Sequence, residues 1–264
     1  MPVSRPTEIM RYDTADTVPV IESERGRMEG LLCEISNPLV QGPHLTGELA
    51  KLTEKNEVHQ EAEDMDELRA MAARLKDTHN ELTSEVAAIG RGRPVLARKL
   101  KKETRMWEKY VEHGFTHTKT GDVLRTSIHF DDLETLYQAV IELYKRAEIV
   151  RVKDRFINPR SSGYRDLLFN IRLTDPETGK AHITEIQFQL EDMYQAKRRE
   201  YPNYIQIRVL EQELAYFKRE EPENTDKIRA LEEEMAYIQS SSQDIFAAAW
   251  RPYASKLLPE TMVA

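Results

Sequence analysis

The chain has 264 residues, of which 40% are hydrophobic and 32% are charged, and its formal net charge is −8. No apolar run approaches the roughly 18 residues that a membrane-spanning helix needs, so we expect a globular protein in water. A single cysteine, Cys33, excludes an internal disulfide and any zinc site built from several cysteines. The first residues lack the basic-then-apolar order of a secretory signal, which predicts a cytoplasmic protein and leaves unconventional secretion open.

Positive charge is concentrated in two segments of this acidic chain. Residues 91–109 carry eight Lys or Arg against two Glu, and residues 145–165 are also basic. Domains that bind nucleic acid usually have a basic net charge, so we expect no extended face for duplex nucleic acid. Focused positive patches suit a small polyanion better.

The first third of the chain changes from irregular to periodic. Residues 1–44 show no clear periodicity and contain several Pro and Gly, which predicts an irregular or partly disordered arm. Apolar residues then recur at steps of three and four over 61–89, which predicts one long helix within a helical extension over 45–90. Gly90 and Gly92 end that helix, and we expect the basic segment after them to form a second helix.

The middle of the chain alternates strands with one helix. Residues 121–130 read as a strand and residues 131–145 as an amphipathic helix. The stretches AEIVRV, DLLFNIRL and AHITEIQFQL read as three further strands, and the turn DPETGK separates the last two. The sequence therefore predicts an α+β fold with a mixed central sheet of four or five strands, flanked by helices.

The C-terminal third, residues 201–264, is predicted to be a helical extension that packs on the domain. Two apolar stripes separated by the loop EEPENTD indicate an antiparallel helical pair. Each stripe spans too few heptads to establish a coiled coil, which leaves an oligomer through these extensions open. The aromatic segment FAAAWRPY, residues 246–253, is expected to dock the last helix onto the domain.

Two carboxylates are placed to hold a metal ion. Asp122 starts one predicted strand, and Glu185 lies in the middle of another, on the face opposite to its apolar neighbours. A carboxylate in the middle of a strand is costly unless it is exposed, paired or bound to a cation. If the two strands belong to one sheet, both side chains can reach one Mg²⁺.

Cations and an aromatic ring complete the predicted site. Phosphate oxygens need cations to neutralise them, and arginine and lysine do so in different geometries. Tyr164 follows Gly163 in a turn, where its ring could stack on a purine. The candidate ATP and phosphate ligands are Arg91, Arg93, Lys101, Lys153, Arg155 and Arg160.

The order of these motifs resembles the synthetase domain of the RelA/SpoT alarmone synthetases. The chain reads R-x-R…K, then G-D-V-L-R, then V-K-D-R-F-x-x-P-R-x-x-G-Y-R-D, then T-E-I-Q-F-Q, over roughly residues 85–200. The resemblance implies a nucleotidyltransferase-like domain over 91–200 that transfers pyrophosphate from ATP to the 3′-hydroxyl of a nucleotide. No GxxxxGK[ST] loop is present, and no H-D motif of the family's hydrolase domain precedes the run.

The resemblance also implies roles for individual residues. Asp122 corresponds to the Mg²⁺-binding aspartate, and Glu185 to the glutamate that acts as metal ligand or base. Lys153 and Arg160 correspond to basic residues near the phosphates, and Tyr164 to the tyrosine that stacks on the acceptor base. Arg91 and Arg93 are similar to the pair that contacts ATP, with Lys101 further along the predicted helix.

One departure from the family bears on the acceptor. The family follows its tyrosine with a histidine four residues later, where this chain has Leu168. Guanine nucleotides, adenine nucleotides and RNA ends therefore all stay open as acceptors. Two other functions also stay open: a toxin or secreted effector of the same fold, and a nucleotide-binding module without catalysis inside a helical scaffold.

Overall fold

The computed structural model describes residues 45, 47–53 and 57–257. The predictions made for residues 1–44, Cys33 among them, lie outside the described residues. The helices are α3 (Gly47–Thr53), α4 (Met65–Arg74), α5 (Lys76–Ile89), α6 (Glu103–Glu112), α7 (Leu133–Arg146), α8 (Glu191–Arg199), α9 (Tyr201–Glu220) and α10 (Thr225–Leu257). The strands are β1 (Arg93–Val95), β2 (Arg125–Phe130), β3 (Glu148–Asp154), β4 (Leu167–Thr174) and β5 (Ala181–Leu190).

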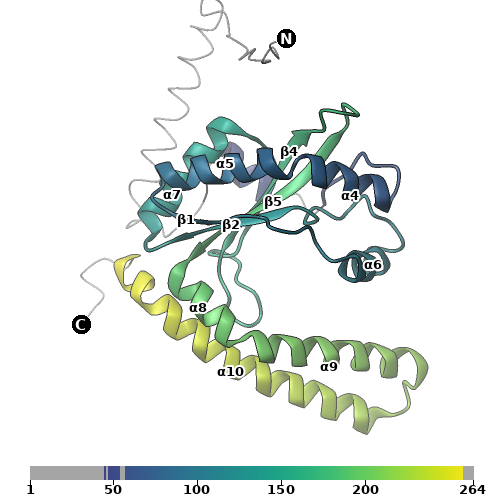
Figure 1. Cartoon of the computed structure of the whole chain (residues 1–264). Coiled ribbons are helices and arrows are strands. Elements are labelled where there is room, and N and C mark those ends of the chain that lie inside the picture. The colour runs from purple at the N-terminus through teal and green to yellow at the C-terminus, as the bar shows by residue number, and fades with distance from the viewer. Residues whose placement is uncertain (1–44, 46, 54–56, 258–264) are drawn as a thin grey trace, which may run out of the picture.

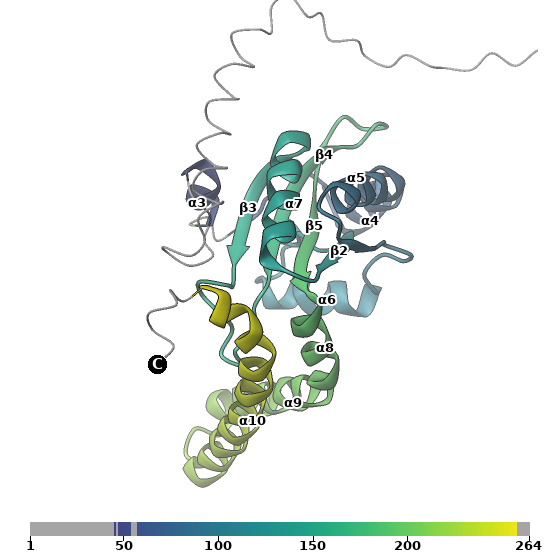
Figure 2. The same cartoon turned by 90° about the vertical axis from the view of Figure 1, so that its left-hand side faces the viewer.

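The five strands form one mixed sheet in the order β1-β2-β5-β4-β3. β2 and β5 run parallel, and the other neighbours pair antiparallel. Figure 1 shows α4, α5 and α7 on one side of this sheet, and Figure 2 shows α3 beside its outer strand β3. The predicted α+β fold with a mixed sheet of four or five strands is confirmed.

The main core lies between the sheet and the helices α5 and α7. Alternate residues of β2, β4 and β5 point into it, since a strand's side chains alternate between its two faces. Leu136, Val140 and Leu143 of α7 meet them at the helical spacing that the sequence shows. The fully buried sheet residues of this face include Ile128, Phe169, Ile171, Ile186, Phe188 and Leu190.

The long helix predicted over 61–89 is two helices that meet at Leu75. The backbone N–H of Leu75 still donates to Met71 O, and the N–H of His79 donates to Leu75 O, so Leu75 keeps both of its helical hydrogen bonds at the junction. The halves pack on different apolar clusters, which explains the bend. Residues of α4 lie against the segment before β2, whereas Val86 and its neighbours in α5 join the main core.

The prediction of a helix that begins directly after Gly92 is wrong. Residues Arg93–Val95 form the edge strand β1, and α6 begins only at Glu103. Gly92 lies so close to β2 that a Cβ there would meet Ile128 Cγ2 at 2.4 Å. Pro94 also lacks the N–H that a helix interior requires. Close packing against β2 and the proline therefore favour an edge strand.

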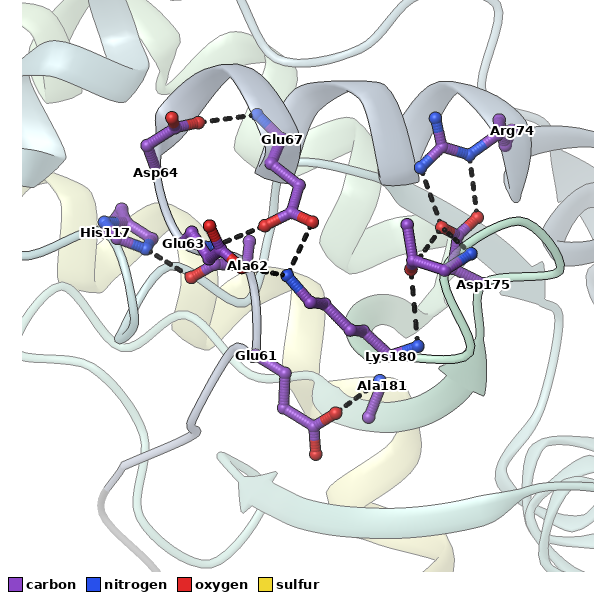
Figure 3. Close-up of polar contacts among 11 residues, drawn as sticks. Glu61, Ala62, Glu63, Asp64, Glu67, Arg74, His117, Asp175, Lys180 and Ala181 are labelled. Atoms are coloured by element: carbon purple, nitrogen blue, oxygen red, sulfur yellow. Dashed lines mark hydrogen bonds and ion pairs between the residues drawn. The ribbon is translucent and has the colours of Figure 1, made fainter.

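A polar network fixes the turn between β4 and β5 to both ends of α4 (Figure 3). Arg74 donates to both carboxylate oxygens of Asp175, at 2.8 and 2.7 Å. Lys180 donates to Glu63 at 2.9 Å and to Glu67 at 2.7 Å. These contacts hold the far end of the β4–β5 hairpin against the helix layer.

A buried glutamine connects the segment before β2 to β5. Gln60 Nε2 donates to the carbonyl oxygens of Thr120 and Ile183, both at 2.8 Å, and Gln60 Oε1 accepts from Ile183 N–H. His117 Nε2 lies 2.7 Å from Ala62 O in the same region, as Figure 3 shows. The backbone that leads to Asp122 is therefore held close to the strand that carries Glu185.

The C-terminal third follows β5 through α8 into the hairpin of α9 and α10 (Figure 1). Leu210, Leu231 and Ile238 form a small core of their own within the hairpin. The aromatic segment then returns to the domain, where Phe246 and Tyr253 are buried in the main core. Among the described helices, none combines the length and apolarity that crossing a membrane requires.

Candidate active site

The face of the sheet opposite to the main core carries a row of polar side chains from four adjacent strands. Arg125 of β2 and Asn170 of β4 both lie in register with Glu185 of β5. Arg151 of β3 lies in register with Asn170 and donates from Nε to its Oδ1 at 2.9 Å. Residues in register share one face, so Glu185 lies between an arginine and an amide.

Asp122 reaches this face from the segment before β2. The strand begins at Arg125, so the prediction that Asp122 starts it is wrong by three residues. Val123 and Leu124 are buried against α4 and α6, and the Lys101 N–H donates to Val123 O at 3.0 Å. This packing brings Lys101 beside the carboxylate, where its Nζ donates to Asp122 Oδ2 at 2.6 Å.

The second carboxylate oxygen of Asp122 is left without a partner. Oδ1 is buried and accepts no hydrogen bond from the described residues. Burial acts to raise the pKa of Asp122, but the charges of Lys101, Lys109 and Arg125 outweigh it and hold this pKa below its ordinary value. Asp122 is thus an ionised carboxylate. Its Oδ2 accepts from Lys101, and its Oδ1 can bind a cation or accept a hydrogen bond.

Glu185 lies in β5 with only 6% of its surface exposed. Burial raises the pKa of Glu185, and the charge of Asp122 raises it further, while Arg125 and a hydrogen bond from Gln187 oppose the rise. The Glu185 N–H donates to Leu124 O at 3.1 Å, and Asn170, in register with Glu185, donates to Gly121 O at 3.2 Å, so the segment that carries Asp122 lies directly beside Glu185. β2 and β5 are neighbours in one sheet, as a shared metal ion requires.

An amide ladder holds the Glu185 carboxylate in place. Gln187 Nε2 donates to Glu185 Oε1 at 2.7 Å, and Gln189 Nε2 donates to Gln187 Oε1 at 2.8 Å. The three residues alternate along one face of β5, so each side chain reaches the next. The ladder ends at Gln189 Oε1, which is buried and has no partner among the described residues.

The two carboxylates fit a magnesium ion that is shared with a substrate. Mg²⁺ prefers hard oxygen ligands, and it usually takes one or two carboxylates and completes its shell with water and phosphate oxygens. Asp122 Oδ1 and the Glu185 carboxylate offer that donor set. Within the described residues, no group of three or more His, Cys, Asp or Glu could hold a metal by itself.

The predicted phosphate ligands of the β3–β4 region lie in different environments. Lys153 is exposed on the polar face, and burial of part of its side chain, with the charges of Arg151 and Arg155, lowers its pKa. Arg155 pairs with the buried Asp166 at 2.6 Å, so its charge is already matched inside the protein. Arg160 is exposed at the turn after β3. Lys153 and Arg160 are therefore accessible, whereas Arg155 holds an internal carboxylate.

Arg91 follows α5, and Arg93 in β1 pairs with the end of β2 that is farther from the two candidate carboxylates. Arg93 lies in register with His129 near the end of β2, where its Nη2 contacts Glu191 and lies 3.0 Å from His129 Nδ1. Asp122 precedes the other end of that strand, and Glu185 lies in register with Arg125 at that end. Strands rise by about 3.3 Å per residue, so the separation along the strand is roughly 20 Å from Asp122 and roughly 13 Å from Glu185. Of the three cations that precede β2 in the prediction, Lys101 contacts Asp122, whereas Arg93 pairs with Glu191, outside the candidate metal site.

Tyr164 is buried, with 5% of its surface exposed. Its hydroxyl donates to Asp166 at 2.8 Å, and its ring packs edge-on against Phe246 of α10 with centroids 5.4 Å apart. Lys197 Nζ lies 4.9 Å from the ring centroid. An acceptor base can stack on this ring only if the surrounding side chains move. Stacking by Tyr164 stays a prediction that needs this rearrangement.

Several residues of the polar face were not predicted from the sequence. Arg125 was noted only as a departure from the family motif, and Arg151 only as part of a basic run. The signal was present, since polar residues alternate along both strands at the spacing of one face. Lys197 had no such signal, because it lies in a charged run of α8 that is typical of a solvated helix.

Leu168 lies on the same polar face as Glu185. It is in register with Gln187 of β5 and Lys153 of β3, and 5% of its surface is exposed. The position where the family motif has a histidine therefore borders the candidate site directly. An apolar side chain there removes one hydrogen-bonding group from the surface that would meet a substrate.

No family model matches the chain, and no curated protein sequence matches it. Solved structures match it by fold. The small alarmone synthetase 1 from Bacillus subtilis, bound to its product pppGpp, has 14% sequence identity and a TM-score of 0.47, over 72% of this chain and 90% of that chain.

Two further solved structures are similar. A GTP pyrophosphokinase family protein from Streptococcus pneumoniae has 18% identity and a TM-score of 0.44, over 69% of this chain and 94% of that chain. The Type VI effector Tas1, solved with its immunity protein, has 19% identity and a TM-score of 0.47, over 70% of this chain and 96% of that chain. These are similarities of fold, to the family that the motifs resemble. At these identities and TM-scores they carry no conclusion about the reaction of this chain.

Proposed function

We propose that this chain transfers pyrophosphate from ATP to the 3′-hydroxyl of a nucleotide in a Mg²⁺-dependent reaction. The observation that supports it best is the arrangement at Asp122. One carboxylate oxygen accepts from Lys101, and the other is buried without a partner beside the buried Glu185. An ionised carboxylate with an unmet oxygen, among cations, suits a bound metal and phosphate groups better than a structural role.

Glu185 is the candidate general base. It would accept the proton of the attacking hydroxyl while a bond forms from that oxygen to the β-phosphorus of ATP, the α–β bridge bond breaks, and AMP leaves. A carboxylate whose pKa is raised by burial takes a proton more readily at neutral pH, and such a base contributes roughly 10²–10⁴-fold to a rate. The ladder from Gln187 keeps its carboxylate oriented.

Charge on the transferred group is met by the chain's own cations. Lys101 and Lys153 border the space around the carboxylates, and Arg125 lies in register with Glu185. Fixed cations that face developing charge stabilise a transition state without reorganisation. Bound Mg²⁺ would neutralise phosphate oxygens, and Asp122 and Glu185 would hold it.

The test is a product analysis with a panel of acceptors. Purified chain, Mg²⁺ and ATP labelled on its γ-phosphate are incubated with GDP, GTP, ADP, ATP or tRNA in turn, and the products are resolved by anion exchange. We expect AMP together with an acceptor that carries the label and two additional phosphates. Lys145→Gln, on α7 at the opposite side of the sheet, serves as an active control.

The outcome also separates the two alternative functions. ATP binding without AMP formation for any acceptor contradicts the proposal and supports a module without catalysis. Label transferred to tRNA or to adenine nucleotides alone, with growth arrest on expression that Glu185→Ala relieves, supports a toxin or effector of this fold. Label on a guanine nucleotide supports an alarmone synthetase.

A further inference from the structure

A group of unmatched cations lies where α8 meets the polar face of the sheet. Lys197 belongs to α8, Arg125 to β2, and Arg160 to the turn between β3 and β4. Among the described residues, none of the three forms an ion pair with a carboxylate. The Arg160 N–H donates to Tyr164 O at 3.1 Å, and Lys197 Nζ lies 3.3 Å from the Tyr164 hydroxyl oxygen. The charges of both arginines also lower the pKa of Lys197. Three elements thus bring positive charge to one place.

The carboxylate nearest to Lys197 does not neutralise it. Lys197 Nζ lies 3.3 Å from the Tyr164 hydroxyl oxygen, and that hydroxyl donates to Asp166 Oδ2 at 2.8 Å. Asp166 already pairs with Arg155 at 2.6 Å through its other oxygen. Arg155 therefore neutralises the charge of Asp166, and the charge of Lys197 is not neutralised by this carboxylate.

Arg125 connects this group to the carboxylate pair. It lies in register with Glu185 on the neighbouring strand, and its charge also acts on Lys197. Cations from α8, from β2 and from the segment before β2 (Lys197, Arg125 and Lys101) therefore surround the carboxylate pair. A single phosphate is too short to meet all of these cations, whereas a di- or triphosphate chain extends along them.

We propose that Lys197, together with Arg125 and Arg160, binds phosphate groups of a di- or triphosphate substrate. The inference rests on the proposed function in that the substrate is a nucleotide polyphosphate, and it adds Lys197 and Arg125 to the residues that hold it. Neither residue was a candidate phosphate ligand in the sequence. Lys197 is a binding residue in this proposal and takes no part in proton transfer.

The charge state of Lys197 supplies a second readout. Burial, together with the charges of the neighbouring arginines, lowers the pKa of Lys197 to about 8 against the opposing effect of Asp166. Lys197 therefore loses its charge just above neutral pH. The charged and titratable groups that face it are Arg125 and His129 from β2, and Arg155, Arg160, Tyr164 and Asp166 from the segment between β3 and β4.

The experiment measures binding of inorganic pyrophosphate to the full chain by calorimetry, without turnover. We expect Lys197→Gln to weaken pyrophosphate binding about tenfold or more, since a hydrogen bond to a charged group is lost. Lys145→Gln is the matched control, because Lys145 pairs with Glu142 on α7 and faces away from the site. Its affinity should equal that of the wild type.

Raising the pH from 7 to 9 tests the same residue differently. Relative to Lys197→Arg, which stays charged, the wild type should lose pyrophosphate affinity over this range, and the comparison cancels ionisation of the pyrophosphate itself. Equal affinity of Lys197→Gln and wild type in a folded variant overturns the inference. If Lys197→Gln does not fold, the exposed Arg160→Gln replaces it, and an unchanged affinity there overturns the inference equally.

Failure of this inference and failure of the proposed function give different results. If the wild type forms AMP and a pyrophosphorylated acceptor, the proposed function is supported. If Lys197→Gln then has the same KM for ATP as the wild type, the role of Lys197 is rejected. If Lys197 contributes to pyrophosphate binding but no acceptor leads to release of AMP, the binding site is supported and the proposed reaction is rejected.

Discussion

Two buried polar clusters lie on opposite faces of β2 and β5, and they differ in how their hydrogen bonds end. On the helix side, His79 meets Thr126 and Thr184 through its two ring nitrogens, at 3.0 Å each. Thr83 donates to His79 O and lies 2.8 Å from Thr126 Oγ1. Both ring nitrogens and all three hydroxyls have partners, so this helix-side cluster is closed and carries no charge.

The cluster on the other face is open and charged. Lys101 pairs with Asp122, and the amide ladder runs from Gln189 to Glu185. Its two ends, Asp122 Oδ1 and Gln189 Oε1, have no partner among the described residues. A closed polar network specifies packing, whereas a partly satisfied one costs stability unless something binds to it. The contrast teaches that the open ends, more than the burial, distinguish a candidate site from structural polarity.

The largest effect is expected from Asp122→Asn, which removes the charge at the open end. Turnover should fall by about 10³-fold or more, because both the metal and the Lys101 contact depend on the carboxylate. The melting temperature should stay within a few degrees of the wild type, since the amide keeps the shape of the side chain. AMP release and thermal melting measure the two effects, and a large loss of folding with residual turnover would make Asp122 structural.

A smaller loss of activity is expected from Glu185→Gln, on the order of 10²-fold. The same substitution should make the folded protein more stable at pH 7. Burial and Asp122 raise the folded-state pKa of Glu185, so its stabilising contribution is complete below the unfolded pKa and is lost as the pH rises. At pH 7 the ionised form is therefore a cost, and removing the charge should raise the melting temperature. A lower melting temperature at pH 7 together with full activity would contradict both roles.

Much of the fold could be predicted because its elements show their period in the sequence. The four strands longer than three residues and α7 follow from alternating and helical spacing. β1 was missed because its three residues are too few for a period, and its pairing depends on contact between Gly92 and Ile128. The bend at Leu75 was missed because one continuous stripe hides that its halves pack on different clusters.

The site was predicted unevenly for a related reason. Asp122 and Glu185 come together because β2 and β5 are neighbours, and the polar face of β5 was visible in its alternation. The distance of Arg93 from them depends on the register of an edge strand, which no spacing reveals. The internal role of Arg155 depends on the burial of Asp166, and the position of Lys197 depends on the direction in which α8 leaves β5. Tertiary packing decides these positions, and the spacing of residues in the sequence does not show it.

On the helix side, His79→Leu should reduce stability and leave catalysis alone. The substitution leaves the Thr184 hydroxyl without its partner in a buried layer, which costs about 1–3 kcal/mol. Chemical unfolding at pH 7 measures that loss, and AMP formation at a temperature well below the transition should match the wild type. Loss of turnover in a folded His79→Leu variant would show that the helix-side cluster is coupled to the site, and would weaken the distinction between the closed and the open cluster.

The smallest effect at neutral pH is expected from His182→Leu, in the same layer. His182 is fully buried, and neither of its ring nitrogens has a partner among the described residues, so leucine removes two unmet polar atoms. We expect an unfolding free energy at pH 7 equal to or above that of the wild type, unlike the loss for His79→Leu.

Acid should separate the His182 variant from the wild type more clearly. Burial lowers the pKa of His182 to about 4 from its ordinary value of 6.5, so below pH 6.5 the unfolded chain takes up a proton that the folded chain refuses. The contribution of this histidine to the free energy of unfolding is present above pH 6.5 and is lost as the pH falls towards 4. Between pH 7 and 4.5, His182→Leu should therefore lose on the order of 2 kcal/mol less stability than the wild type. Parallel pH profiles for the two proteins, or a large loss at pH 7, would mean that His182 has a partner in solution and belongs with the closed cluster.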